Sequence, residues 1–266
     1  MGSEMCIRDS CNPEVKFWAL FKLKRELGAS WVATGHYARV VYDPQSKEYQ
    51  LLEALDRGKD QSYFLFQLKL SWLKRIIFPL GEKSKAQIKK YAQELGLASA
   101  KREESQDLCF VYSRNYAQVI ELLAKKSSKE GEIINSQGRV LGKHKGIYYY
   151  TIGQHRGLGI NEPGWYVAKI LPEKNQIVVG RDKELYHQKM LVEDLNWLVK
   201  VEFPLSCQAK IRYRSEKADC LVERAGEKEV LVRFVQRQRA ITPGQASVFY
   251  LGERVLGGGW IKEVIE

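Results

Sequence analysis

The sequence lacks several features that would each assign it to a class of protein. It has no run approaching the roughly 18 apolar residues of a membrane-spanning helix, and its first residues contain no apolar secretory segment. Its five cysteines form no CxxC pair and no dense framework, which argues against a zinc ribbon and a disulfide-stapled secreted scaffold. We therefore expect a cytoplasmic globular protein, monomeric, without a metal site and without a membrane contact.

Acidic residues are scarce relative to basic ones. The chain has 43 Lys and Arg against 32 Asp and Glu, a formal charge of +11, which points to a polyanionic partner and first to nucleic acid. Residues 137–160 contain no acidic residue, and their basic groups alternate with His and Tyr. Such a stretch suits single-stranded RNA, whose bases stack on aromatic rings. The alternative is a solvated, tyrosine-rich hairpin, and both interpretations stay open for this stretch.

The hydrophobic pattern changes along the chain and predicts three domains. A helix from Asn12, an apolar strand at 31–34 and a later capped helix are typical of a parallel α/β sheet. Glycine-punctuated strands follow, and then short strands at regular spacing indicate a closed antiparallel β-barrel. The predicted division is a tag-like or artefactual segment 1–10, an α/β domain 11–111, a small central α+β or β domain 112–191, and the C-terminal barrel 192–266.

Two local patterns are specific enough to predict individual contacts. Ser84 followed by Gln87 predicts a capping box at the start of a helix. The segments 166–171 and 176–179 flank a Pro-Glu-Lys-Asn turn, which predicts a pair of antiparallel strands.

Two cysteines occupy positions that favour a thiolate. Cys11 directly precedes Asn12, the predicted N-cap, and the partial positive charge of a helix N-terminus lowers the pKa of a thiol. Cys109 lies in a polar segment shortly after two basic residues. Because a thiolate is a strong nucleophile, the pair indicates sulfur chemistry. The alternative for Cys109, which has apolar neighbours in the sequence, is a small buried hydrophobe.

Other candidate residues follow predicted strands. Gly35 and His36 come directly after the apolar strand 31–34, and ligands of open α/β sheets bind beyond the carboxyl ends of strands. They are therefore candidates to contact a nucleotide or a substrate at this edge of the sheet. The alternative is that they form an ordinary turn. Farther along, Arg212 and Tyr213 alternate on a predicted barrel strand, which we expect to meet an RNA backbone.

Seven groups of residues occur in one order along the chain: Cys11–Asn12 with Val15–Phe17, Ala33–Tyr37, Lys59–Phe64, Phe78–Gly81, Ser105–Phe110, Tyr150–Gln154 with Gly157–Ile160, and Thr242–Gln245. Together they resemble the tRNA-specific 2-thiouridylase family. Each motif alone is a weak signal, whereas the joint order is specific. The resemblance implies that the α/β domain is a partial Rossmann-like ATP-pyrophosphatase domain, followed by the central domain and the barrel.

The resemblance also implies an activity. Enzymes of this family use ATP, here expected with Mg²⁺, to replace the 2-oxygen of the wobble uridine with sulfur in tRNAs for Lys, Glu and Gln. ATP adenylates the uridine oxygen, and a cysteine persulfide supplies the sulfur. By this resemblance Cys109 holds the persulfide, received from a cysteine desulfurase or a sulfur-relay protein, and Cys11 is the nucleophile that resolves it. The other implied contacts are Gly35 with ATP, and with tRNA His36, Lys59, Asp60, Gln61, Arg212, Tyr213 and Gln245.

The chain departs from the family in one motif. The family has a glycine-rich SGGxDS loop whose backbone N–H groups cradle phosphates, and none occurs in these 266 residues. An Asp expected just upstream of Cys11 is also missing from its matching position. We therefore expect a chain that lacks about a hundred residues of a typical domain arrangement and does not adenylate uridine unaided.

Two alternatives remain at this point. The first is a catalytically silent tRNA-binding fragment. The second is another ATP-pyrophosphatase, such as an amidotransferase-type synthetase, which explains neither the paired cysteines nor the basic barrel.

Overall fold

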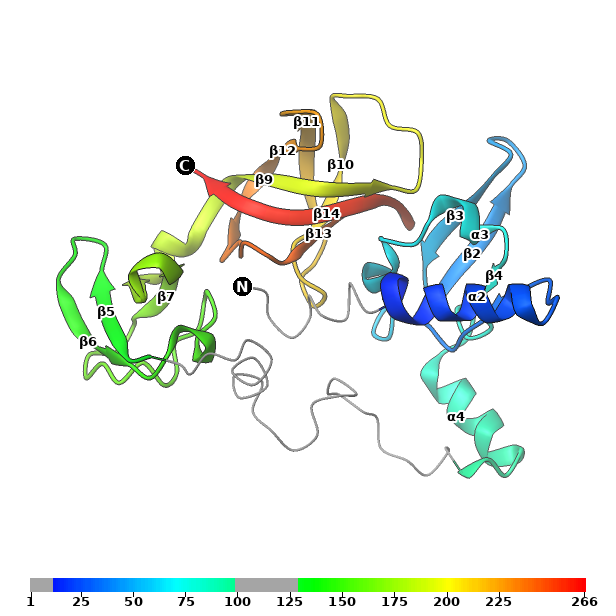
Figure 1. Cartoon of the computed structure of the whole chain (residues 1–266), viewed down its shortest axis with the longest axis horizontal. Helices are drawn as coiled ribbons and strands as arrows, with labels where there is room; N and C mark the ends of the chain where they lie inside the picture. Colours follow the sequence, from blue (N-terminus) through cyan, green and yellow to red (C-terminus); the bar gives the residue numbers. More distant parts are fainter. Residues whose placement is uncertain (1–11, 99–128) are drawn as a thin grey trace.

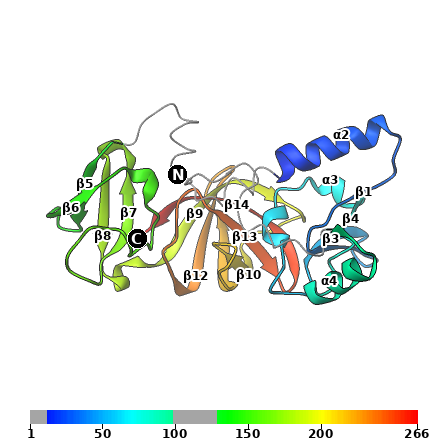
Figure 2. The same ribbon diagram turned by 90° about the horizontal axis from the view of Figure 1, so that it is seen from below.

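The structure is a computed structural model that describes residues 12–98 and 129–266. The expectations for Cys11 and Cys109 lie outside the described residues. Three sheets organise the described chain, and in Figures 1 and 2 the C-terminal barrel lies between the N-terminal and central domains. No helix in the described ranges has the length and apolar character needed to cross a bilayer.

The N-terminal domain surrounds a short parallel strand pair. Strands β1 (Val32–Ala33) and β4 (Ile76–Ile77) pair in parallel, as the α/β interpretation requires, while β2 and β3 form an antiparallel hairpin. The other elements are η1 (Asn12–Phe17), α2 (Trp18–Glu26), β2 (Ala38–Asp43), β3 (Glu48–Glu53), η2 (Ser62–Leu65), α3 (Leu70–Leu73) and α4 (Lys85–Glu94).

The two predicted helix starts have different outcomes. The capping box of α4 is confirmed, because the Ser84 side chain accepts from the Gln87 backbone and the Gln87 side chain accepts from the Ser84 backbone. The prediction of Asn12 as an N-cap outside the helix is wrong: Asn12 is the first residue of the π-helical element η1. Its buried side chain instead donates to the Phe64 carbonyl at 3.2 Å, so a tertiary contact replaces the local cap.

The central domain is a four-stranded sheet in the order β6-β5-β8-β7. The predicted pairing of 166–171 with 176–179 is confirmed by the antiparallel strands β7 and β8. Ile133, Val167 and Ile177 form the fully buried centre of its core. The elements are β5 (Gly131–Asn135), β6 (Val140–His144), η4 (Ile147–Tyr149), β7 (Tyr166–Leu171), η5 (Pro172–Lys174), β8 (Gln176–Gly180) and η6 (Asp182–Leu185).

The C-terminal domain is a closed six-stranded antiparallel barrel, as predicted. Its strands follow the order β13-β10-β11-β12-β9-β14, and β13 closes on β14. The first barrel strand begins at Tyr186, six residues before the division expected at 192, because β9 follows the short helix η6 directly, with no connecting residue. The strands are β9 (Tyr186–Trp197), β10 (Leu205–Lys210), β11 (Ala218–Arg224), β12 (Val230–Arg239), β13 (Ala246–Leu251) and β14 (Arg254–Ile265).

The N-terminal domain and the barrel share one hydrophobic core. Fully buried Phe66 and Leu51 of the N-terminal domain pack in the same cluster as Val248 and Val255 of the barrel. Strand β3 also continues the barrel sheet, since Leu52 pairs with Arg254 of β14. The close approach depends on Gly258: a Cβ there would lie 2.6 Å from the Ser247 carbonyl oxygen and 2.7 Å from the Phe66 ring.

We predict that Gly258→Ala destabilises the protein by about 2 kcal/mol, because the added methyl group overpacks the contact with Phe66. Urea unfolding measures the change in free energy. Gly226→Ala is the matched control, since its Cβ would meet only Glu229 Cβ at 3.8 Å, and we expect a change within about 0.5 kcal/mol. Equal stability of the two variants would contradict the assignment of Gly258 to a tight contact.

Candidate functional site

Two of the motif loops are joined directly to each other. The Gln61 backbone N–H donates to the Tyr37 carbonyl at 2.8 Å, and the Tyr37 N–H donates to the Gln61 side-chain oxygen at 3.0 Å. Gln61 therefore holds the Gly35–Tyr37 loop, which follows β1, against the Lys59–Gln61 loop. The family resemblance implied that both loops belong to one site. The structure shows that hydrogen bonds join them directly.

His36 stands at an aromatic wall of this site. Its ring is stacked on Phe17 at 5.7 Å and meets Phe78 edge-on at 6.0 Å, while its Nδ1 lies 2.8 Å from the Thr34 hydroxyl. Burial, followed by the nearby positive charge of Lys16, lowers the pKa of His36 to about 4. At neutral pH the imidazole is uncharged, so it can stack and exchange hydrogen bonds but cannot neutralise a phosphate.

Asp60 organises the loop from within. Its side chain is buried, and Oδ1 accepts from the backbone N–H groups of Ala54 at 2.8 Å and Ser62 at 3.3 Å. The other oxygen, Oδ2, accepts from the Ser62 hydroxyl at 2.8 Å. Burial raises the pKa of Asp60 despite these bonds. The carboxylate thus shapes the loop that presents half-buried Lys59, rather than projecting from it.

Arg212 and Tyr213 lie in a turn, which corrects the prediction that they alternate on a barrel strand. Strand β10 ends at Lys210, and Ser215 closes the following turn by donating to the Arg212 carbonyl at 2.9 Å. The Arg212 guanidinium donates to the Arg239 carbonyl at 2.8 Å and to the Ala240 carbonyl. The Tyr213 ring lies 4.4 Å from the Phe64 ring of the N-terminal domain, so this turn joins the barrel to the first domain.

Gln245 is buried in the barrel near the N-terminal domain. It ends the Thr242–Gln245 turn that leads into β13, and its carbonyl accepts from the Ile261 N–H at 2.8 Å. The Gly244 N–H donates back to the Ile261 carbonyl at 2.7 Å, so β14 holds both sides of the turn. The motif therefore forms a rigid corner of the barrel.

Gly35 is exposed at the carboxyl end of β1. A Cβ at this position would meet only the Leu80 side chain, at 3.7 Å. The backbone here is accessible to a ligand, as it must be if a nucleotide binds at this edge of the sheet.

The basic, tyrosine-rich stretch of the central domain divides into buried and accessible residues. His144 is buried, where its Nε2 lies 3.0 Å from the Asn175 carbonyl and its Nδ1 accepts from the Gly146 N–H. Tyr150 is also buried. Lys145 lies over the Tyr149 ring, 4.8 Å from its centre, and both are less buried. His144 and Tyr150 therefore belong to the buried interior of the central domain. The Lys145–Tyr149 pair has the basic and aromatic character expected of an RNA contact.

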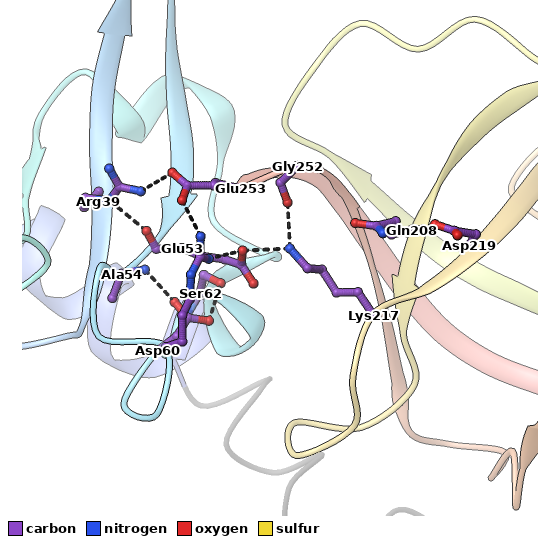
Figure 3. A network of polar contacts seen from close by, with 11 residues as sticks. Arg39, Glu53, Ala54, Asp60, Ser62, Gln208, Lys217, Asp219, Gly252 and Glu253 are labelled. Carbon is purple, nitrogen blue, oxygen red and sulfur yellow. Dashed lines mark hydrogen bonds and ion pairs between the residues drawn. The ribbon is translucent and has the colours of Figure 1, made fainter.

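No pattern in the sequence predicts the charged network that connects the loops to the barrel. It involves Arg39, Glu53, Lys217 and Glu253, which come from distant parts of the chain (Figure 3). Arg57 joins it by pairing with both Glu53 and Glu253. In the sequence each is an ordinary charged residue outside the motifs, so no local pattern could have singled it out. In the described ranges, no group of three or more His, Cys, Asp or Glu residues could hold a metal ion.

Three family models match the chain. They are described as the tRNA methyl transferase HUP domain over residues 6–113, the tRNA methyl transferase PRC-barrel domain over 121–181, and the aminomethyltransferase beta-barrel domain over 187–261. Their order is that of the N-terminal domain, the central sheet and the six-stranded barrel.

Curated relatives match nearly the whole chain. It is 43% identical over 258 residues to the tRNA-specific 2-thiouridylase MnmA of Carboxydothermus hydrogenoformans, covering 96% of this chain and 70% of the relative. It is 45% identical over 256 residues to the protein of the same name from Rickettsia akari, covering 94% and 69%. The corresponding protein of Syntrophotalea carbinolica is 43% identical over 253 residues, with 94% and 71% covered.

We predict that Asp60→Ala destabilises the protein by about 3 kcal/mol, because the Ala54 and Ser62 donors lose a buried acceptor. Asp60→Asn is the matched control. It keeps an oxygen for the Ala54 N–H, its amide can donate to the Ser62 hydroxyl, and it removes a charge that burial disfavours, so we expect a cost below about 1 kcal/mol. Denaturant unfolding distinguishes the two, and equal losses would show that the carboxylate itself is required.

We predict that His36 makes stability depend on pH. Its folded pKa of about 4 lies below the unfolded value of 6.5, so the unfolded chain takes up the proton first as the pH falls. The contribution is fully present above pH 6.5 and is lost towards pH 4, by about 3 kcal/mol in total.

Unfolding of wild type and His36→Asn at pH 7 and pH 5 measures this term. Other groups titrate equally in both proteins, so the difference isolates His36. An equal loss of stability in the two proteins would contradict a half-buried, neutral imidazole.

Proposed function

The chain belongs to the tRNA-specific 2-thiouridylase family, and we propose that it acts in the replacement of the 2-oxygen of a tRNA uridine by sulfur. The observation that carries this proposal is the junction of the Gly35–Tyr37 and Lys59–Gln61 loops through Gln61. The aromatic wall of that junction includes Phe17, the last residue of η1, the element that begins directly after Cys11. The candidate nucleophile is thus adjacent in sequence to the element that lines the candidate substrate site.

We infer that the RNA is bound by the loops and by the faces beside them. Lys59 offers a cation, neutral His36 offers a stacking and hydrogen-bonding surface, and Asp60 and Gln61 hold the loops in shape. Arg212 and Tyr213 contribute the adjoining barrel surface, since Tyr213 packs on Phe64, and buried Gln245 supports that surface from the Thr242–Gln245 turn. The net charge of +11 favours a polyanion. The wobble uridine must leave its stack to enter such a site, and we propose tRNAs for Lys, Glu and Gln as the substrates.

For the sulfur-transfer half we propose that Cys109 carries a persulfide and that Cys11 resolves it. A cysteine desulfurase or a relay protein delivers the outer sulfur to the Cys109 thiolate. The Cys11 thiolate attacks the inner, Cys109 sulfur of the persulfide, so the Cys11–Cys109 disulfide forms as the bond to the outer sulfur breaks. The outer sulfur leaves at the oxidation level of sulfide and bonds to the uridine carbon, from which the activated oxygen departs. A cellular thiol then reduces the disulfide. A reducing compartment suits this cycle, so we assign the reaction to the cytoplasm.

The reaction also uses ATP, and we propose that Mg²⁺ accompanies it. The exposed backbone at Gly35 fits contact with a nucleotide. When bound, ATP supplies the adenylyl group that makes the uridine oxygen a leaving group. The 266 residues contain no SGGxDS sequence, so we assign no residue of this chain to the phosphates.

We predict that incubation of the chain with a cysteine desulfurase and cysteine places one sulfur atom on Cys109, and that subsequent oxidation yields a Cys11–Cys109 disulfide. Peptide mapping by thiol mass spectrometry detects both species. Cys109→Ser should abolish both, whereas Cys11→Ser should abolish only the disulfide.

Cys207→Ser is the matched control. Cys207 and Cys220 are buried partners on β10 and β11, so neither should accept sulfur from the donor. Loading of Cys207 to the same extent as Cys109 would contradict the assignment. Absence of both sulfur species would favour the silent RNA-binding alternative.

A further inference from the structure

A nearly buried carboxylate marks the boundary between the N-terminal domain and the barrel. Glu53 is the last residue of β3, and its side chain is only 6% exposed. It accepts from Lys217 Nζ at 2.8 Å, and Lys217 lies in the turn between barrel strands β10 and β11. Lys217 also donates to the Gly252 carbonyl of the β13–β14 turn at 2.7 Å (Figure 3). One barrel lysine therefore connects three separate segments of chain.

A second carboxylate crosses the same boundary in the opposite direction. Glu253, on the β13–β14 turn, pairs with Arg39 of β2 at 2.5 Å and with Arg57. Arg57 also pairs with Glu53, and Arg39 donates to the Glu53 carbonyl at 2.8 Å. The N-terminal domain contributes two cations and one anion, and the barrel contributes one of each, so that cations face anions across the boundary. Sliding one domain along the other would place like charges together.

The network leads directly into the loop of the candidate site. Ala54 follows Glu53 in the chain, and its N–H donates to the Asp60 carboxylate at 2.8 Å. Gln61, the next residue after Asp60, holds the backbone of Tyr37. A continuous series of bonds thus runs from Lys217 in the barrel to the loop that contains His36.

We propose that Lys217 and Glu253 are positioning residues, through which the barrel sets the conformation of the Lys59–Gln61 loop that receives tRNA. The inference rests on the proposed function, because it concerns how the same RNA site is shaped. Glu53 has little access to water, and loss of Lys217 leaves its charge only partly compensated. The end of β3 would then move to regain solvent, and the loop with it. By this proposal the barrel also stabilises the conformation of the Lys59–Gln61 loop, in addition to offering a surface to RNA.

A charge-reversal cycle tests this proposal. The variants are Lys217→Glu, Glu53→Lys and the double variant, which has the net charge of wild type. Hydrogen exchange of amides 54–62 measures the order of the loop without RNA, and fluorescence anisotropy measures the dissociation constant for tRNA. We expect each single variant to speed loop exchange and to weaken tRNA binding at least tenfold. The double variant re-forms an ion pair between positions 53 and 217 but not the contacts with Arg57 and the Gly252 carbonyl, so we expect it to regain at least about threefold in affinity and to slow exchange again.

Glu53→Lys distinguishes an effect on the position of the Lys59–Gln61 loop from a simple electrostatic attraction between the protein and RNA. It makes the protein more positive, so a purely electrostatic effect on RNA would strengthen binding, whereas lost positioning weakens it. Lys262→Glu is the control for charge on the barrel, because Lys262 pairs with Glu229 at 2.5 Å and Glu193 at 3.9 Å, both within the barrel. It should leave loop exchange unchanged.

If the charge-reversal variants do not fold, Lys217→Met replaces them in the exchange measurement. It removes the positive charge and keeps an unbranched side chain near the Tyr250 ring. It should also speed exchange of amides 54–62. Unchanged exchange in a folded Lys217 variant, or single variants that bind tRNA as wild type does, would overturn the proposal. A wild-type chain without affinity for tRNA would instead overturn the proposed function, while the exchange measurement would still test the connection between Lys217 and the loop.

Discussion

The hydrophobic core shared by the N-terminal domain and the barrel is the constraint from which the rest of the arrangement follows. Phe66 reaches β14 only because Gly258 has no side chain, and Tyr63 extends the contact by donating to the Ala246 carbonyl at 2.9 Å. Burial of these large aromatic rings outweighs the contribution of any single surface pair. The two domains are thereby held close enough for the charges of Glu53 and Lys217 to meet.

Polar bonds then determine the details that apolar packing leaves open. Apolar contacts are non-directional, so they bring elements together without setting the course of a loop. Asp60, Gln61 and Asn12 supply direction, because each uses its side chain to hold backbone groups of another segment. The site loops consequently depend on residues whose side chains point inward. A motif residue can thus be essential for the shape of these loops while its own side chain is buried.

Elements with local signals were predictable from the sequence, and those with only tertiary causes were not. The capping box at Ser84 and the pairing of β7 with β8 involve residues close in the chain, and both are as expected. Arg212 and Tyr213 were predicted to belong to a strand because they continue the alternating residue pattern of β10. The structure turns there because Ser215 offers a competing bond to the Arg212 backbone, and because Tyr213 gains a partner in Phe64.

The order of short motifs along the chain indicated the family, which the comparisons show, and singled out the two cysteines as candidates for sulfur transfer. The change in hydrophobic pattern predicted a division into three domains. Those conclusions depend on residue type and spacing, which a linear sequence contains in full. The neutrality of His36, the inward orientation of Asp60 and the contact of Glu53 with Lys217 depend on burial and on neighbours far along the chain. Only folding creates those environments, since desolvation and long-range pairing do not exist in the extended chain.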